Sequence, residues 1–174
     1  QGDADAWILK LHPDGSIAWQ KTYGGCCGDF VRCMAETSDG GFILGGNTYS
    51  FGVDFIHPWL LKLDINGDIL FQRIYRRSTD GNDSISFVQQ TSEGGYIVGA
   101  STNTHEATWI FKLDSNADLV WQNIYDINEE WETANFIQQT MDNGYIIGGL
   151  VLQPSSEIGD AWVSKLDEDG VIPD

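Results

Sequence analysis

The apolar residues of the chain gather in a short run that occurs four times, each copy opening on tryptophan and carrying lysine at its fourth position. The copies are Trp7-Ile8-Leu9-Lys10-Leu11-His12, Trp59-Leu60-Leu61-Lys62-Leu63-Asp64, Trp109-Ile110-Phe111-Lys112-Leu113-Asp114 and Trp162-Val163-Ser164-Lys165-Leu166-Asp167. The tryptophans lie 52, 50 and 53 residues apart, a period long enough for one four-stranded sheet. This spacing predicts a repeat protein.

Each repeat contains four apolar runs separated by turn residues, and in one copy the runs cover residues 85–91, 96–101, 109–113 and 119–125. Turns such as Ser92-Glu93-Gly94-Gly95 supply the positive φ that a tight hairpin requires. Small pairs such as Gly45-Gly46 in the second run indicate a bulge or the close approach of another backbone. We therefore expect each repeat to be a four-stranded antiparallel meander, and the chain to be all-β.

The tryptophan run is apolar on both faces of its predicted strand. Trp59, Leu61 and Leu63 point one way, while Leu60 and Lys62 point the other. A sheet with one solvated face would alternate apolar and polar residues, so this pattern predicts sheets that are covered on both sides. We expect the four repeated tryptophans to be equivalent buried residues between neighbouring sheets. The repeated lysines are expected to lay their stems over apolar surface.

A hairpin and a second aromatic signature follow the tryptophan run. The hairpin contains Asn66-Gly67 in one repeat and Asn116-Ala117 in the next, where Ala117 must accept a positive φ or change the turn type. The signatures of the following strand are Trp19-Gln20, Phe71-Gln72 and Trp121-Gln122, and the strand closes on Tyr23, Tyr75 or Tyr125.

Charge narrows the range of partners. With 26 acidic against 9 basic residues, the formal net charge is −17 and the pI is about 4.1, which disfavours nucleic acid and anionic membrane surfaces. No apolar run approaches the roughly 20 residues that a membrane helix needs, so membrane insertion is not expected.

The three cysteines, Cys26, Cys27 and Cys33, all lie in the first part of the chain and have no counterparts in later repeats. Their spacing matches no zinc or haem motif. Cys33 fits a core thiol of a strand. For the adjacent pair two interpretations remain: reduced thiols without a function, or a strained disulfide in a loop.

The combined motif, Asp-x-Trp-Leu-x-Lys-Leu-Asp followed by Asp-Gly-Gly-Tyr-Ile-x-Gly-Gly, resembles the β-propeller repeats of secreted and cell-surface bacterial and archaeal proteins, including those called seven-bladed propeller repeats. The resemblance implies a β-propeller, or a segment of one, with four-stranded antiparallel blades and about three and a half repeats. It divides the single region 1–174 into a partial repeat 1–29 and repeats at about 30–79, 80–129 and 130–174. It also implies that residues 30–37, 85–91 and 134–140 line the axis.

Polar residues occupy matching positions on these innermost strands. Glu36, Gln90 and Gln139 are candidate channel-lining residues that would bind a small ligand at the axis. The alternative is a water-filled channel that tolerates such side chains without a ligand.

Calcium is the one cofactor with a candidate sequence. Asp64, Asn66 and Asp68 place oxygen atoms at alternate positions around Gly67, as a calcium loop does. The same residues also suit a tight turn, and the distal glutamate of a full EF-type loop is missing, so we expect the turn and no tight metal site. The three histidines, His12, His57 and His105, occupy unlike places in the repeat, and no catalytic or cofactor-binding set stands out.

These observations favour a non-enzymatic, extracellular or cell-surface β-propeller that acts as a structural or protein-interaction module through aromatic-rich rim loops. The alternative function is a propeller that binds a ligand or carbohydrate, with or without hydrolysing it, at its central channel. Thirteen or fourteen predicted strands are too few to close a typical ring. We therefore expect a protein partner, further blades or self-association to cover the open blade faces.

Overall fold

The computed structural model describes residues 4–51, 55–77, 82–102, 107–125, 131–152 and 159–173, and all its regular elements are strands. The strands are β1 (Ala6–Leu11), β2 (Ile17–Tyr23), β3 (Asp29–Glu36), β4 (Phe42–Thr48), β5 (His57–Leu63), β6 (Ile69–Ile74), β7 (Ser84–Gln90), β8 (Tyr96–Ser101), β9 (Thr108–Leu113), β10 (Leu119–Tyr125), β11 (Trp131–Gln139), β12 (Tyr145–Leu152) and β13 (Gly159–Leu166). None of the described segments forms a helix capable of crossing a membrane.

The strands form four antiparallel sheets in chain order. The first sheet pairs β1 with β2, the second runs β3-β4-β5-β6, the third runs β7-β8-β9-β10, and the fourth runs β11-β12-β13. Within each sheet, every strand pairs with the strand next to it in sequence, so each sheet is a meander. The predicted all-β class and the four-stranded antiparallel unit are confirmed.

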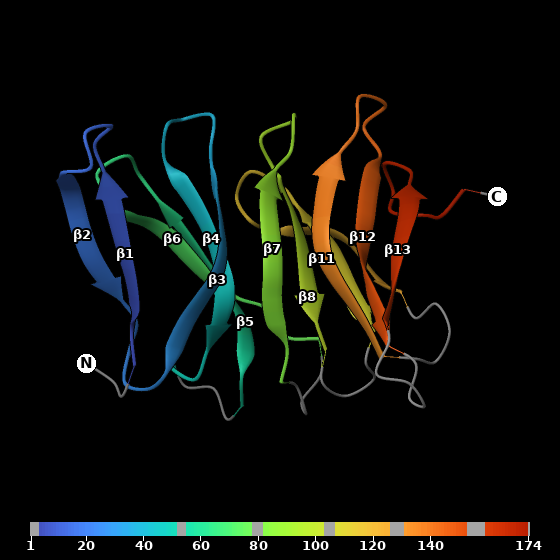
Figure 1. Cartoon of the computed structure of the whole chain (residues 1–174), viewed down its shortest axis with the longest axis horizontal. Helices are drawn as coiled ribbons and strands as arrows, with labels where there is room; N and C mark the ends of the chain where they lie inside the picture. Colours follow the sequence, from blue (N-terminus) through green and yellow to red (C-terminus); the bar gives the residue numbers. More distant parts are fainter. Residues whose placement is uncertain are drawn as a thin grey trace.

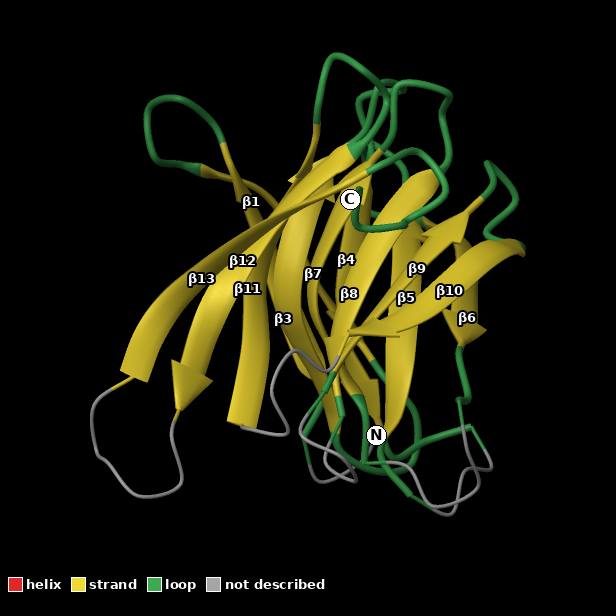
Figure 2. Cartoon of the chain, turned by 90° about the vertical axis from the view of Figure 1, so that its right-hand side faces the viewer, coloured by secondary structure: helices red, strands yellow, loops and turns green. Residues whose placement is uncertain are grey.

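The four sheets stand side by side, with the first sheet and the fourth at opposite ends of the row (Figure 1). Strand β7 lies against β3 on one side and β11 on the other, so the opening strands of three sheets are neighbours. In the perpendicular view, the second and third sheets extend from these strands to β6 and β10 at the far side (Figure 2). The fold thus places the opening strands of the second, third and fourth sheets along a common line.

Side chains between the sheets form three separate apolar clusters, and each uses the same two faces. The tryptophan face of one sheet packs on the opposite face of the sheet before it. Trp59, Leu61 and Leu63 pack with Ala6 and Ile8 of the first sheet. Trp109, Phe111 and Leu113 pack with Ile43 and Leu60 of the second sheet, and Trp162 packs with Ile97 and Ile110 of the third.

Two of the four repeated tryptophans are not buried as predicted. Trp59 and Trp109 are 1% and 2% exposed, but Trp7 is 60% exposed and Trp162 is half-buried. The expectation of four equivalent buried residues is therefore wrong. For Trp7 the physical reason is position in the row: no described sheet precedes the first, so the face that carries Trp7 meets solvent.

Hydrogen bonds from tyrosine join consecutive sheets at the hairpins. The hydroxyl of Tyr23 donates to the carbonyl of Gly67 at 2.7 Å, and that of Tyr75 donates to Ala117 at 2.8 Å. Tyr125 donates to Gly170 in the same way. Ala117 accepts a φ of 63° rather than changing the turn, and its carbonyl accepts from Tyr75 as that of Gly67 accepts from Tyr23.

Bulges occur where the small pairs predicted them. The register shifts between Val31 and Cys33, opposite Gly45 and Gly46. A Cβ atom on Gly46 would fall 1.8 Å from the carbonyl oxygen of Phe30, so only glycine fits there. The same shift recurs between β7 and β8 and between β11 and β12. The bulge is therefore a property of the repeat.

Candidate functional site

A groove of about 360 Å³ runs between the opening strands β3, β7 and β11. Its walls are Ala35, Phe87, Val88, Gln89, Asn135, Phe136, Ile137 and Gln138. The polar groups among them are the side-chain amides of Gln89, Asn135 and Gln138, and the exposed ring of Phe136 adds an apolar surface. Amides and a ring can hold a polar ligand by hydrogen bonds and stacking, but they provide no acid, base or nucleophile.

The channel-lining candidates lie beside this groove, and two of them hold the sheets together. The side-chain oxygen of Gln90 accepts from the backbone N–H of Ser38 at 2.7 Å. That of Gln139 accepts from the backbone N–H of Ser92 at 2.8 Å. Each glutamine thus ties its strand to the first turn of the preceding sheet.

Glu36 occupies the matching position in β3 and is exposed. The sheet before it consists of β1 and β2 and has no turn equivalent to the ones that hold Gln90 and Gln139. The three residues are thus brought to one end of neighbouring strands, and the amides of Gln90 and Gln139 are used between sheets. Whether they line a channel stays a prediction.

The opposite end of the opening strands carries a buried aspartate that sequence reasoning missed. Asp29 is 1% exposed, and its carboxylate accepts hydrogen bonds from the hydroxyls of Thr48 and Ser50 and from the backbone N–H of Gly25. The neighbouring Oδ1 of Asp5 is buried and has no hydrogen-bond partner. Asp29 therefore anchors the 24–28 loop to the β4–β5 connection.

Asp83 occupies the corresponding place before β7 and is also 1% exposed. Burial raises the pKa of its carboxyl group, while the nearby Arg77 and His57 partly oppose this shift. The Nε atom of Arg77 lies 3.7 Å from the Asp83 carboxylate. The third sheet thus places the Arg77 cation beside its buried aspartate, whereas the second sheet places the hydroxyl groups of Thr48 and Ser50 there.

A sequence signal for these two aspartates was available. Asp29 and Asp83 both come directly before or at the start of an opening strand; Thr48 ends the partner strand opposite Asp29, and Thr102 follows the end of β8 at the matching position. Matching acids at one repeat position indicate a shared structural role, but only Asp29 bonds its threonine, because the hydroxyl of Thr102 donates to the carbonyl of Ala107 instead. The cue is weak, because Ser50 lies 21 residues from Asp29 along the chain.

Exposed aromatic side chains gather around the 24–28 loop. Phe30, Tyr49 and Phe51 are 43%, 43% and 41% exposed. A Cβ atom on Gly28 would meet both the Phe30 and the Tyr49 rings, and one on Gly25 would lie 3.4 Å from the Phe51 ring. We call Phe30, Tyr49 and Phe51 the rim patch. Phe55, also exposed, belongs to the same β4–β5 connection as Tyr49 and Phe51.

The calcium candidates form a hydrogen-bonded turn. The Oδ1 atom of Asp64 accepts from the backbone N–H groups of Asn66 and Asp68, both at 2.8 Å, and these bonds lower the pKa of Asp64. Asp68 pairs with Lys21 of the preceding sheet at 2.7 Å. Asp114 repeats the turn with Asn116 and Asp118. Both carboxylates are engaged with N–H groups, and the expected lack of a tight metal site remains untested.

The repeated lysines form ion pairs with acids of the first turn. The distances are 2.9 Å for Lys62 and Asp39, 3.6 Å for Lys112 and Glu93, and 3.0 Å for Lys165 and Asp142. Lys10 has no such turn in its own sheet, and its Nζ lies 5.1 Å from the ring of Phe42 instead.

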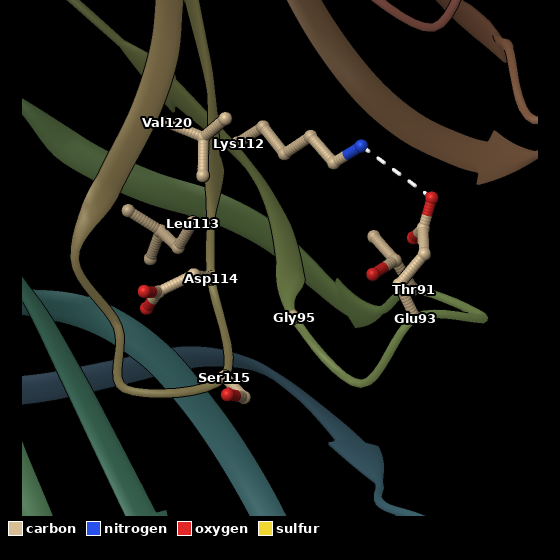
Figure 3. A pocket seen from close by; sticks show the side chains of 8 residues that line it. All are labelled: Thr91, Glu93, Gly95, Lys112, Leu113, Asp114, Ser115 and Val120. Atoms are coloured by element: carbon tan, nitrogen blue, oxygen red, sulfur yellow. Dashed lines mark ion pairs between the residues drawn. The ribbon is translucent and has the colours of Figure 1, made fainter.

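One of these pairs borders a pocket of about 270 Å³ (Figure 3). Lys112 and Glu93 meet across its upper side, while Asp114 lies away from Glu93. Burial favours the neutral amine, yet Tyr145 and Glu93 raise the pKa of Lys112 above its usual value. The lysine therefore stays protonated at neutral pH, which suits a structural cation and not a nucleophile.

The two histidines that the structure describes lie in different sheets. His12 is exposed in the β1–β2 hairpin, and His57 is buried at the start of β5. His105 lies outside the described residues. Among the residues that the structure does describe, no group of three or more histidine, cysteine or acidic side chains is arranged to hold a metal.

These features define an all-β repeat protein of several packed antiparallel sheets, with an amide-lined groove on one side and an aromatic rim at one end. No known protein family's model matches the chain, and no curated protein matches it.

Proposed function

We propose that the chain is a segment of a non-enzymatic β-propeller, extracellular or on the cell surface, that serves as a structural or protein-interaction module. The rim patch is its contact surface. The observation that carries this proposal is the cluster of exposed aromatic rings held by a buried hydrogen-bond network at the end of the first two sheets.

The repeated packing supports the propeller part of the proposal. Three consecutive sheets use one pair of faces, and their opening strands lie side by side along one line. Propeller blades are four-stranded sheets arranged radially about a central channel. In such a ring β3, β7 and β11 are the innermost strands, and the 360 Å³ groove belongs to the channel.

The rim patch supports a protein partner. Tyrosine and phenylalanine rings give large contact area at low entropic cost, and aromatic residues are enriched at the centres of interfaces. Asp29 holds the underlying loops through three hydrogen bonds, which fixes the rings before a partner arrives. A preordered surface loses less entropy on binding.

The end faces of the row support a further association. Trp7 and Leu11 on the first sheet are 60% and 51% exposed, and Val163 on the fourth is 62% exposed. Each belongs to a face that is covered by a neighbouring sheet elsewhere in the chain. Additional blades or another copy of the chain would cover these faces and remove apolar surface from water.

The axial groove favours the second candidate, a carbohydrate- or ligand-binding propeller. Side-chain amides of Gln89 and Gln138 beside the exposed ring of Phe136 provide the hydrogen bonds and the stacking surface that sugars require. Among the described residues that line it, the groove has no pair of carboxylates, which a typical glycosidase needs. Binding without hydrolysis is therefore the form of this alternative that its residues support.

Binding arrays separate the two candidates. The chain is applied at one concentration to an array of extracellular proteins and to an array of glycans. A rim variant (Tyr49→Ser with Phe51→Ser) and a groove variant (Gln89→Ala with Gln138→Ala) are compared with the parent. We expect protein binding that the rim variant loses and the groove variant keeps.

Glycan binding that is lost in the groove variant and kept in the rim variant contradicts the proposal in favour of the second candidate. Circular dichroism of both variants controls for folding. The location is tested separately by protease treatment of intact cells of the source organism, in which a surface module is cleaved and an intracellular one is protected.

A further inference from the structure

We propose that Cys26 and Cys27 form a redox-active pair that is converted reversibly between two thiols and a disulfide joining the adjacent residues. The pair lies in the 24–28 loop between β2 and β3. Its two Sγ atoms are 2.8 Å apart and already point towards each other. This chemistry does not depend on the proposed binding function.

The sulfur atoms need little movement to bond. A disulfide bond is about 2.0 Å long, so the two atoms have to approach by only about 0.8 Å. Because the cysteines are adjacent, no loop has to close between them, and the second thiol is always within reach of the first. Reaction within the pair is therefore faster than reaction between two chains.

Hydrogen bonds hold the loop on both sides of the thiols. The backbone N–H of Gly25 donates to Asp29 at 2.7 Å, and that of Cys27 donates to the hydroxyl of Ser50 at 3.1 Å. Ser50 in turn donates to Asp29 at 2.7 Å. The buried aspartate thus fixes the backbone that carries both sulfur atoms.

Exposure decides which thiol reacts first. Cys26 is exposed and Cys27 is half-buried, so a dissolved disulfide such as oxidised glutathione reaches Cys26. The Cys26 thiolate attacks one glutathione sulfur, forms a mixed disulfide and releases one molecule of glutathione. The Cys27 thiolate then attacks the Cys26 sulfur and releases the second. Two protein thiols are oxidised, and one glutathione disulfide is reduced to two thiols.

The third cysteine is a control built into the chain. Cys33 is half-buried in β3 and lies 3.6 Å from the carbonyl oxygen of Gly45. Burial raises the pKa of its thiol to about 12. Because the thiolate is the reactive form, Cys33 stays inert at neutral pH.

The product is expected to be easily reduced. Adjacent Cα atoms are about 3.8 Å apart across a trans peptide, whereas disulfides normally join Cα atoms about 4.4 to 6.8 Å apart. Strained and exposed disulfides are the labile ones. The loop also touches the rim patch, since Tyr49 donates its backbone N–H to Gly28 at 2.9 Å.

The test uses the full chain, first reduced and then freed of reductant. Oxidised glutathione is added, remaining thiols are alkylated, and the products are read by intact mass and peptide mapping. We expect the chain to lose two hydrogen atoms, to retain no glutathione, and to keep one alkylatable thiol, at Cys33, after unfolding. A mild dithiol should restore the other two.

Variants separate the two steps. Cys27→Ser should stop the reaction at a stable glutathione adduct on Cys26, whereas Cys33→Ser should react as the parent does. The inference is overturned if the parent chain keeps the glutathione adduct, if Cys26 and Cys27 stay alkylatable after oxidation, or if the disulfide forms between chains. Since the decisive measurement is made on the unchanged chain, poor folding of a variant does not obscure it.

Discussion

The second sheet and the first sheet carry the same tryptophan motif, but only one of the two tryptophans is buried. Trp59 is 1% exposed and donates its indole N–H to Gln72 at 3.3 Å. Trp7 is 60% exposed on an equivalent strand. The strand pattern is shared, and the neighbour differs: the first sheet lies against Trp59, while nothing described lies against Trp7.

The comparison shows that burial in this chain is a property of pairs of sheets. Each apolar face is completed by the sheet that precedes or follows it, as the three clusters between sheets demonstrate. The stability of a repeat therefore depends on its own fold and on the interface with its neighbours. The predictions that follow test this dependence, beginning with the largest effect.

Replacing the buried tryptophan should have the largest effect. Trp59→Ala removes a side chain from the cluster between the first and second sheets and should cost about 3 to 5 kcal/mol. Trp7→Ala, the matched control, should change the free energy of unfolding by less than about 0.5 kcal/mol because its ring is exposed. Urea denaturation followed by circular dichroism measures both. Equal effects of the two variants would refute the comparison.

The tyrosine bond between the first and second sheets should have an intermediate effect. Tyr23→Phe removes the hydrogen bond to Gly67 and should cost about 1 kcal/mol at neutral pH. Burial, with the charges of Asp68 and Asp64, raises the pKa of Tyr23 from 10.0 to about 12. A raised pKa means that the folded chain holds the proton more tightly. The contribution of Tyr23 to the free energy of unfolding is therefore complete below pH 10 and is lost as the pH rises towards 12.

The difference in stability between Tyr23→Phe and the parent should therefore shrink between pH 10 and 12. Tyr49→Phe is the control, because its ring is exposed and belongs to the rim patch. A constant difference across this range would contradict the assigned hydrogen bond.

Removing a repeated lysine should lower the free energy of unfolding more in an inner sheet than in an end sheet, and this difference should be smaller than the one between the tryptophan variants. The side chain of Lys62 is 5% exposed and that of Lys165 is 40% exposed, although both pair with a turn aspartate. Lys62→Met should cost about 1 kcal/mol and Lys165→Met less than about 0.5 kcal/mol. Thermal unfolding of the two variants compares them directly, and a larger cost at Lys165 would contradict the account.

Acid should remove the contribution of the Lys62 pair. Bonds from Thr37, Lys62 and Gly41 lower the pKa of Asp39 below its usual 3.8. A lowered pKa stabilises the folded chain above pH 3.8 and stops doing so as the pH falls through the folded value. The difference between Lys62→Met and the parent should accordingly diminish below pH 3.8.

Calcium should have the smallest effect, namely none at the hairpin turns. Asp64 and Asp114 each use their Oδ1 atom to accept two backbone N–H groups of the turn, so we expect the inner sheets to gain no metal site that the first sheet, with His12 in place of aspartate, lacks. Calorimetric titration should give no saturable heat. A stoichiometric micromolar signal that Asp64→Ala abolishes would move this turn into the functional site.

The strands were predictable because they depend on local pattern. The expected runs 85–91 and 96–101 match β7 and β8 within one residue, and glycine or asparagine occupies most of the tight turns. These features follow from side-chain alternation and from φ preferences, which act within a few residues.

The candidate site was less predictable because its contacts cross between repeats. Gln90 was expected at an axis with a ligand or water, yet its oxygen accepts from Ser38, 52 residues earlier. Within the second sheet, the network of Asp29, Thr48 and Ser50 likewise joins residues 19 and 21 positions apart, which only the pairing of β3 with β4 brings together. Which polar groups meet across sheets is set by the packing angle and register of the sheets, and neither is encoded in one repeat.

Residue-resolved amide hydrogen exchange tests the central claim most directly, because it reports how strongly each sheet is held by its neighbours. The account predicts that β4, β5, β8 and β9, covered on both faces, exchange most slowly. It also predicts that β1 and β2, with one open face, exchange at least about tenfold faster. Equal protection of the first sheet and the inner sheets would contradict the claim that burial here is created by adjacent repeats.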